Sequence, residues 1–466
     1  MADAIIQGIF SAAFLASILR VTTPILLPSL GALISDRAGV INIGLEGMML
    51  GAAFTGVVVS AYSQTWFGPE IGQVIGPWLG LVAGVFVAVM MALLLGFFHL
   101  RLKANLILSG VAISFLGSAA TVAIMFELTG DRGNTSTLAS LQIPFIQLPE
   151  FINSIPVIGP FFFQVFDNQS AMTWVAFISV GLVWFLLYRT PFGMHLRASG
   201  ENPTAAQSVG IPVQRTRFIA LMLSGLFAGL GGIHMSMGYL SLFQRDMTAG
   251  RGFIALATPL LGGNNPVGTM AASMVFGFFD ALSNRIGSLQ IPSMLPLMIP
   301  NVATVLALVI YALQTRQSQR VKALRASASG DFNNAYWNIL QRLSLLHVIL
   351  AMLAIIGVII TICLFAAPNG FGGSEVAFPI GFIIAAASAV LIAINVPFLA
   401  RVERISQHAW YSGAAAVVSL GIYVGLFLSL FNAPTVSFPL ALLVGAVIWS
   451  ALGGMRLNGM AHSKTA

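Results

Sequence analysis

The stretch "SDRAGVINIGLEGMMLGAAFTG", Ser35 to Gly56, carries two polar side chains within a segment that otherwise has the composition of a membrane span. Asn42 and Glu46 are four residues apart, which places them on one face of a helix. A charged group within a bilayer costs roughly 2.5–3.5 kcal/mol on insertion scales, so it needs a compensating role. We consider three roles for Glu46: it lines a polar pathway, it caps a half-helix by accepting backbone N–H groups, or it pairs with Arg37.

The composition of the whole chain is that of an integral membrane protein. Charged residues make up 8% of the 466 residues, against about 25% in soluble proteins. The hydrophobic fraction is 58% and the mean hydropathy is +0.92. The long apolar runs predict an all-α, polytopic transmembrane helix bundle. The single cysteine, Cys363, excludes an intrachain disulfide framework.

Hydrophobic runs divide the chain into three parts. We expect a core at 1–313 with about eight spans, a basic linker at 314–342, and a four-helix transmembrane extension at 343–466. The expected spans are 5–30, 40–62, 74–98, 104–126, 171–188, 217–238, 252–284, 295–313, 343–366, 378–399, 409–432 and 437–452. No Lys or Arg precedes Arg20, so the first run is expected to be a retained helix rather than a signal peptide.

The span at 252–284 is interrupted by "GGNNP", Gly262 to Pro266. Because the first piece is too short to cross a bilayer of about 30 Å, we expect a re-entrant or broken helix here. Irregular backbone at that depth is tolerated only where it is buried in protein or lines a water-filled cavity.

Lys and Arg in short loops mark the cytoplasmic side of a membrane protein. Four basic segments are therefore placed in the cytoplasm: 101–103, 189–216, 314–342 and 401–404. The 31–39 turn then falls on the same side. The segments 127–170 and 239–251 and the N-terminus are expected outside, with 127–170 packed as a cap.

Several polar residues fall within the expected spans, and two interpretations remain open for each. Singly, such groups are typical of hydrogen bonds between helices. Together they predict a polar, uncharged lumen that suits a neutral, hydroxyl-bearing solute. The candidates for the translocation pathway are Asn42, Glu46, Asn105, Asn264 and Asn265. Asp280 lies late in its span and is expected near the external interface, and His234 is expected to make a contact between helices.

A short helix is predicted in the cytoplasmic loop "RASGENPTAAQSVGIPVQRTR", Arg197 to Arg217. Asn202 is a suitable N-cap, and Pro203 suits the first helical position. The helix is expected over Thr204–Val209, with Gly200 ending the element before it. A two-turn helix between basic flanks would be presented to the cytoplasm.

This loop resembles the coupling helix of ABC-importer permeases. The residues that carry the resemblance are Gly200, Glu201, Asn202, Ala205, Ala206, Gly210 and Ile211. "SDRAGVINIGLEGMML" (35–50) and "TAGRGFIALATPLLGGNNPVG" (248–268) resemble two signature stretches of the nucleoside and simple-sugar permeases. That branch belongs to the superfamily of ribose and branched-chain amino-acid permeases. Its signature glycines here are Gly44, Gly47, Gly250 and Gly252, the last two expected at the external rim.

The resemblance covers roughly 5–313. It implies a multi-pass importer subunit in the bacterial cytoplasmic (inner) membrane, with several partners. These are ABC ATPase subunits that bind ATP and Mg²⁺, a second permease that can be a different chain, and an external solute-binding lipoprotein. Nucleic acid is not an expected partner. The three lysines, Lys103, Lys322 and Lys464, are not preceded by glycine, so this chain lacks a Walker A motif and is expected to bind no cofactor itself.

Two other classes of function are weighed. A proton-coupled secondary transporter of a small neutral solute would use Glu46 as its carrier, since broken helices also occur in such proteins. A membrane scaffold or enzyme is the third class. The sequence shows no catalytic constellation and no His pair with metal-ligand spacing, so we expect neither a catalytic nor a metal site.

Overall fold

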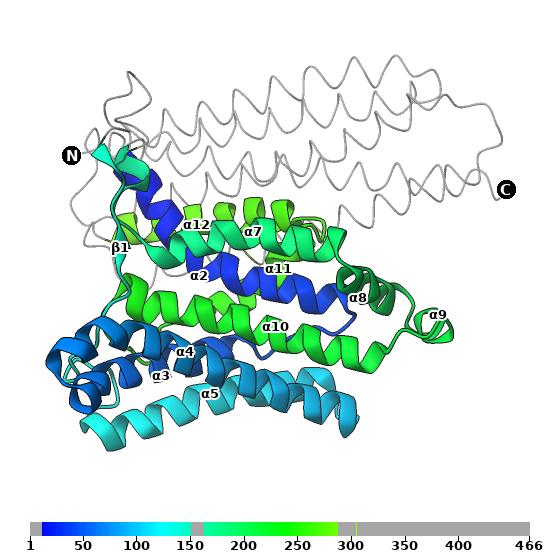
Figure 1. The fold of residues 1–466 in the computed structure, drawn as a ribbon, viewed down its shortest axis with the longest axis horizontal. Coiled ribbons are helices and arrows are strands. Elements are labelled where there is room, and N and C mark those ends of the chain that lie inside the picture. The colour runs from blue at the N-terminus through cyan, green and yellow to red at the C-terminus, as the bar shows by residue number, and fades with distance from the viewer. Residues whose placement is uncertain (1–11, 151–162, 288–303, 305–466) are drawn as a thin grey trace, which may run out of the picture. The chain divides into compact units, whose positions relative to one another are not determined.

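The computed structural model describes residues 12–150, 163–287 and 304 (Figure 1). Cα packing divides the chain into two compact units: Gln7–Leu282, and Met1–Ile6 with Ser283–Ala466. Almost all described residues belong to the first unit. The linker at 314–342, the extension at 343–466 and, apart from residue 304, the expected span at 295–313 lie outside the described residues.

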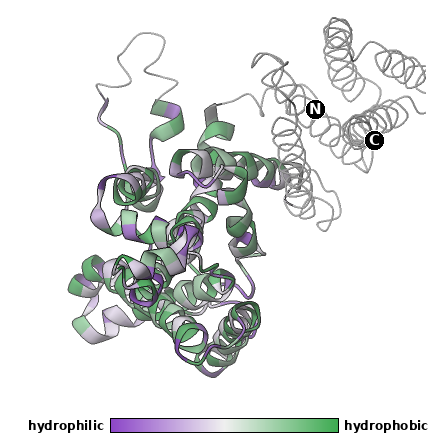
Figure 2. Ribbon diagram, turned by 90° about the vertical axis from the view of Figure 1, so that its right-hand side faces the viewer, coloured by the Kyte–Doolittle hydropathy of each residue, from purple (hydrophilic) through white to green (hydrophobic). Residues whose placement is uncertain are grey.

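The described part of the chain is an all-α bundle, as predicted. Seven of its helices are long and apolar enough to cross a membrane. They are α2 (Ala12–Arg37), α3 (Leu45–Phe67), α4 (Pro69–Gly96), α5 (Leu106–Thr129), α7 (Ala171–Arg189), α10 (Val213–Ile233) and α12 (Pro266–Gly287). The π-helical turns η1 (Phe97–Arg101) and η3 (His234–Tyr239) continue α4 and α10. Most helices are seen nearly end-on in Figure 2, so they run roughly parallel.

Two apolar clusters hold the bundle together. One joins α3, α4 and α10 through residues such as Met49, Ala88 and Ile233, and the other joins α2, α7 and α10. Small residues bring α3 and α4 close, since a Cβ at Gly80 would stand 2.5 Å from the Gly56 carbonyl oxygen. The only sheet in the described residues pairs β1 (Phe145–Ile146) with β2 (Gln169–Ser170) antiparallel, so part of the 127–170 segment is tied to the start of α7.

The turn expected at 31–39 lies later in the chain. Helix α2 continues to Arg37, and the connection to α3 is formed by 38–44. The reason is burial: Leu30, Leu33 and Ile34 are almost completely enclosed by neighbouring helices, which stabilise the helix beyond the predicted end.

The expected end of an element at Gly200 is also corrected. Gly200 lies inside a helix that the sequence did not predict, α8 (Pro191–Glu201), capped by the Thr190 hydroxyl. A Cβ at Gly200 would stand 2.2 Å from the Arg37 carbonyl oxygen, so the glycine serves close packing of α8 on α2. The predicted short helix is α9 (Pro203–Ser208).

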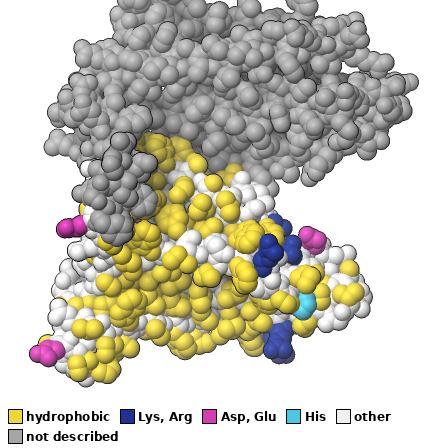
Figure 3. All heavy atoms as spheres, turned by 45° about the horizontal axis from the view of Figure 1, so that its top comes forward, with side chains coloured by type: hydrophobic (Ala, Val, Ile, Leu, Met, Phe, Trp, Pro, Cys, Tyr) yellow, Lys and Arg dark blue, Asp and Glu magenta, His cyan; other side chains and the backbone are white. Residues whose placement is uncertain are grey.

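Helices α8 and α9 lie at the end of the bundle where α2 ends, and β1 lies at the opposite end (Figure 1). We call the first of these the basic end, because it carries arginines such as Arg37, Arg101, Arg189, Arg197 and Arg215. On the face drawn in Figure 3, charged side chains gather toward the two ends and apolar side chains cover the surface between them. This is the distribution expected of a bundle that sits in a bilayer.

Candidate functional site

The broken helix predicted at 252–284 consists of α11 (Arg251–Leu261), a turn, and α12. Eleven residues of helix measure about 16 Å, roughly half of the hydrocarbon thickness. The turn contains Gly263 and Asn264, both with positive φ. Arg37 Nε donates to the Asn264 carbonyl at 2.9 Å, so the turn lies at the basic end, where α2 ends.

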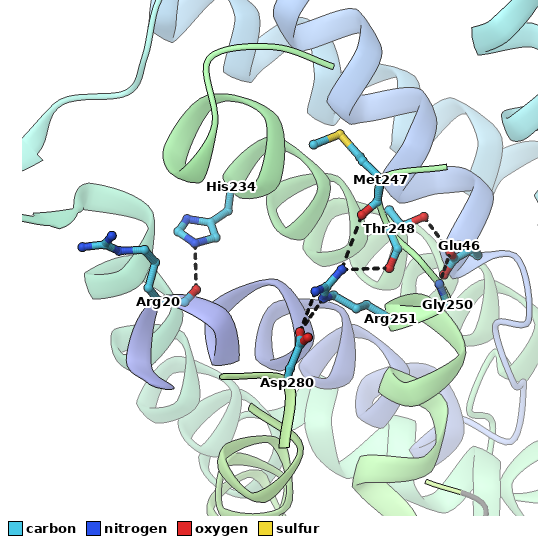
Figure 4. A network of polar contacts seen from close by, with 8 residues as sticks. All are labelled: Arg20, Glu46, His234, Met247, Thr248, Gly250, Arg251 and Asp280. Atoms are coloured by element: carbon cyan, nitrogen blue, oxygen red, sulfur yellow. Dashed lines mark hydrogen bonds and ion pairs between the residues drawn. The ribbon is translucent and has the colours of Figure 1, made fainter. Parts of the chain in front are cut away.

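Glu46 caps the other end of α11 (Figure 4). Its Oε1 accepts the Thr248 hydroxyl at 2.6 Å and the Gly250 N–H at 2.9 Å, and its Oε2 accepts the Gly252 N–H at 2.7 Å. The first N–H groups of a helix have no partner within the helix, and the helix dipole favours negative charge there. Of the three roles considered for Glu46, the structure selects the cap, and Arg37 is engaged elsewhere.

The two glycines of this signature stretch are explained by the cap. Gly250 has φ +83°, a conformation that other residues rarely adopt. A Cβ on Gly252 would stand 2.6 Å from Glu46 Oε2 and 2.7 Å from its Cα, so only glycine allows this approach. The expected place of Gly250 and Gly252 at the external rim is wrong. Gly250 and Gly252 contact Glu46. The residue after Glu46, Gly47, packs against Ile113 and Ser114, which lie well inside α5, so the two glycines lie inside the bundle.

Arg251 and Asp280 form an ion pair beside the cap. Arg251 Nη2 lies 2.6 Å and Nε 2.8 Å from Asp280 Oδ2, and the two side chains are 17% and 8% exposed. Arg251 Nη1 also donates to the carbonyls of Met247 and Thr248, each at 3.4 Å. Asp280 is buried among the helices, and Arg251 compensates its charge there. Its expected position near the external interface stays a prediction.

Asn42 is completely buried and serves the packing of α3. Its Nδ2 donates to the Ser224 hydroxyl at 2.9 Å, and its Oδ1 accepts the Gly44 N–H at 3.1 Å. Gly44 in turn packs on Ile113 of α5. The side-chain amide and carbonyl of Asn42 are thus both hydrogen-bonded within the protein. This agrees with the interpretation of Asn42 as a hydrogen bond between helices rather than as a residue of the translocation pathway.

The other expected pathway residues lie apart from Glu46. Asn264 and Asn265 are at the far end of α11, where Asn265 Oδ1 accepts the Val267 N–H and caps α12. Asn105 is the N-cap of α5, accepting from Ile107 and Leu108. The structure therefore does not bring the five candidates to one lumen. Asn105 and Asn265 accept from nearby backbone and Asn42 bonds between helices, whereas the buried Asn264 Oδ1 has no hydrogen-bond partner among the described residues. His234, as expected, contacts another helix, with Nε2 3.1 Å from the Arg20 carbonyl oxygen (Figure 4).

Helix α9 is fastened to the bundle on one side and exposed on the other. Asn202 Oδ1 accepts the Ala205 N–H at 3.0 Å, the expected N-cap. Ala206 is buried, whereas Ala205 is exposed and the apolar side chain of Val209 is 75% exposed. Gly210 follows with φ +85°. Glu201, grouped with this helix in the sequence, instead ends α8.

Sequence reasoning missed two features because they join distant segments. Thr248 donates to Glu46 across 202 positions, and Ser118 donates to Asp246 across 128. The sequence held a sign of the Thr248–Glu46 contact, because both residues lie in the two quoted signature stretches. In the described residues no group of three or more His, Cys, Asp or Glu side chains is arranged to hold a metal ion.

Comparison with known proteins gives the family. Residues 14–313 match the family of branched-chain amino acid transport system permease components. The chain is 38% identical to the guanosine ABC transporter permease protein NupQ of Bacillus subtilis, over 61% of this chain and 87% of NupQ. It is 32% identical to the nucleoside ABC transporter permease protein NupC of Lactococcus lactis, over 64% and 91% of the two chains. A proposed glucose ABC transporter permease protein of Haloferax volcanii is 33% identical, over 60% and 80%.

These similarities and the seven apolar helices make the protein a multi-pass protein of the inner membrane and a transporter subunit. The family match covers most of the chain and includes the Glu46 cap, the broken helix and α9. The chain belongs to the family of permease components of the branched-chain amino acid transport systems.

Proposed function

We propose that this chain is the membrane permease of an ATP-driven importer of nucleosides, and that α9 is the part that a separate ATPase subunit contacts. The observation that carries the proposal is the presentation of α9. A six-residue helix is too short to be stable alone. It is nevertheless capped by Asn202, anchored by buried Ala206, and offers the exposed Val209 to a partner.

The place of α9 supports a mechanical link to the bundle. It follows α8 directly, and Gly200 of α8 contacts the carbonyl of Arg37 at the end of α2. Arg37 in turn binds the turn between α11 and α12. A movement of α9 would thus be transmitted through direct contacts to α8, then to the end of α2, and then to the turn between α11 and α12. Alternating access by tilting of packed helices requires such a connection.

Nucleosides are the proposed cargo because NupQ and NupC are named for guanosine and nucleoside transport. The similarity to a proposed glucose permease leaves simple sugars as the competing cargo class. The charges at the start of α11 are compensated within the protein, Glu46 by the helix N-terminus and Arg251 by Asp280. This compensation removes a fixed charge that would attract an ionic solute, which favours a neutral one.

In this proposal the other components of the transporter are separate subunits. ATP and Mg²⁺ bind to the ATPase subunits, a second permease completes the channel, and an external lipoprotein delivers the solute. A proton-coupled mechanism with Glu46 as the carrier is disfavoured, because both of its carboxylate oxygens accept hydrogen bonds from the α11 segment.

Uptake of radiolabelled guanosine by cells that express the whole transporter tests the function. We expect uptake that is competed by adenosine and uridine but not by ribose, and that persists with an uncoupler while ATP is maintained. Uptake that collapses with the uncoupler at constant ATP would support the proton-coupled alternative. Competition by ribose or glucose alone would reassign the cargo to sugars.

The role of α9 is tested separately by Val209→Asp. We expect the variant to remain in the membrane but to lose co-purification of the ATPase subunit and ATP-dependent uptake. The matched control is Leu102→Asp, because Leu102 is also an exposed apolar side chain (59%) in a basic loop, between α4 and α5. Undiminished co-purification with Val209→Asp, or equal loss in both variants, would contradict the proposed contact.

A further inference from the structure

One member of an exposed ion pair, Asp246, is bonded to the middle of a membrane-spanning helix, while the Arg245 N–H donates at 2.9 Å to the carbonyl of Gly133, in the segment that follows this helix. Ser118 is close to the midpoint of α5, a 24-residue span whose one charged residue, Glu127, is in the last turn. The Ser118 hydroxyl donates to Asp246 Oδ1 at 2.8 Å, which fixes the depth of this carboxylate. Asp246 pairs with Arg245 at 3.4 Å, and the two side chains are 57% and 60% exposed.

Lipid does not fit this surface. Charged side chains in membrane spans face the protein interior or a water-filled cavity, because their transfer into hydrocarbon is costly. Non-helical backbone at membrane depth is subject to the same restriction. The segment that carries Arg245 and Asp246 lies between η3 and α11, and Asp246 and Ala249 have positive φ. We infer that this face of α5 borders water.

The bundle provides its own example of a lipid-facing surface for comparison. From Val82 to Leu94, the exposed side chains on α4 recur every fourth residue and are all apolar: Val82, Phe86, Met90 and Leu94. Such a stripe needs no partner but lipid. The face of α5 differs, since exposed Phe115 lies about one helical turn from Ser118, whose hydroxyl binds Asp246 of the ion pair. An aromatic ring beside paired charges is suited to a solute with a flat ring and hydroxyl groups.

We propose that Phe115, Ser118 and the Arg245–Asp246 pair form a water-exposed contact site for the nucleoside in transit. The base would lie against Phe115, and the Asp246 carboxylate would accept hydrogen bonds from the ribose hydroxyls. The identity of the solute rests on the proposed function, whereas the water-exposed face rests on the geometry alone. The site is separate from the Glu46 cap, which is occupied by the protein.

Thiol labelling tests whether the face is wet. Phe115→Cys and the control Phe86→Cys are made in a Cys363→Ser background, so that each chain has one cysteine. The two phenylalanines are similarly exposed, 71% and 61%. In membranes with the assembled transporter, a hydrophilic maleimide should label position 115 about tenfold faster, because the reactive thiolate forms in water and not in lipid. Equal rates would overturn the inference, whether lipid or a second permease covers the face.

Guanosine tests whether the solute reaches the site. Guanosine should slow labelling at position 115 while glucose does not, and the absence of protection would overturn the contact with cargo. Asp246→Asn should lower the ratio of maximal guanosine to 2′,3′-dideoxyguanosine uptake toward one, and an unchanged ratio would exclude the carboxylate contact. Faster labelling at 115 in a transporter that takes up no guanosine would reject the proposed function but retain the wet face. Guanosine uptake with equal labelling would reject only this inference.

Discussion

Glu46 Oε2 accepts the backbone N–H of Gly252 at 2.7 Å, although the two residues are 206 positions apart. The contact joins the first turn of α3 to the first turn of the half-helix α11. It holds a helix end that would otherwise leave N–H groups unpaired inside the bundle. Glu46 therefore stabilises the helix arrangement on which the proposed transport depends. Its replacement should lower the unfolding stability of the chain.

Glu46→Ala should destabilise the purified chain by about 2 kcal/mol or more, because hydrogen bonds to a charged group each contribute about 1.5–3 kcal/mol. Glu46→Gln retains one carbonyl acceptor and should fall between Ala and the unmodified chain. The control is Glu70→Ala, since Glu70 is an exposed carboxylate in the first turn of α4. Thermal unfolding in detergent is the measurement. A Glu46→Ala midpoint equal to that of Glu70→Ala would refute the cap.

Gly252→Ala should be more damaging than its single methyl group implies. The added Cβ would stand 2.6 Å from Glu46 Oε2 and 2.7 Å from its backbone nitrogen, so the cap must open. Gly181→Ala in α7 is the matched change, because nothing lies within 4 Å of its Cβ position. It should be neutral or stabilising by about 0.5–1 kcal/mol. Similar unfolding midpoints for the two variants would show that the close approach at Gly252 is not present.

The ion pair between Arg251 and Asp280 should behave as a buried pair. Arg251→Met or Asp280→Asn alone leaves a buried charge or donor without its partner and should cost about 3–5 kcal/mol. The double variant Arg251→Met/Asp280→Leu should be more stable than either single one. The exposed Arg245–Asp246 pair provides the comparison, with a coupling of about 0–1 kcal/mol. A double-mutant cycle with no coupling at Arg251 and Asp280 would contradict the assignment.

Asn202 and Asn105 are both N-caps, and they offer a matched pair of substitutions. Loss of an N-cap costs about 1 kcal/mol. For α9, a six-residue helix, this should be enough to fray it, so Asn202→Ala should reduce ATPase co-purification and ATP-dependent uptake. Asn105→Ala removes the same interaction from a long membrane helix and should leave both unchanged. Asn202→Asp should restore function, and equal effects of the two alanine variants would argue against a special role for α9.

Composition and periodicity predicted the parts of the fold that depend on local sequence. The membrane helices follow from long apolar runs, and α9 follows from Asn202, Pro203 and Gly210, whose effects act within a few residues. The end of α2 could not be placed in this way, because burial of Leu33 and Ile34 extends the helix. Gly200 was misassigned for the same reason, since its role is a contact with α2 rather than a local break.

The candidate site was predicted in its residues but not in its connections. Glu46 and Gly252 were both recognised in signature stretches, yet nothing in either stretch states that they meet. A single sequence also does not distinguish an asparagine that caps a helix, such as Asn105, from one that bonds between helices, such as Asn42. The Asp246 contact with Ser118 had no local signal, because it depends on where an irregular segment returns to α5.

The central claim is that this chain is a permease driven by a separate ATPase through α9. The most direct test is cross-linking from Val209→Cys, in a Cys363→Ser background, within the assembled transporter in membranes. We predict a cross-link to the ATPase subunit whose yield changes between ATP-bound and nucleotide-free states. Labelling of this position by an impermeant thiol reagent added from outside the cell, or a cross-link to no ATPase in any state, would contradict the account.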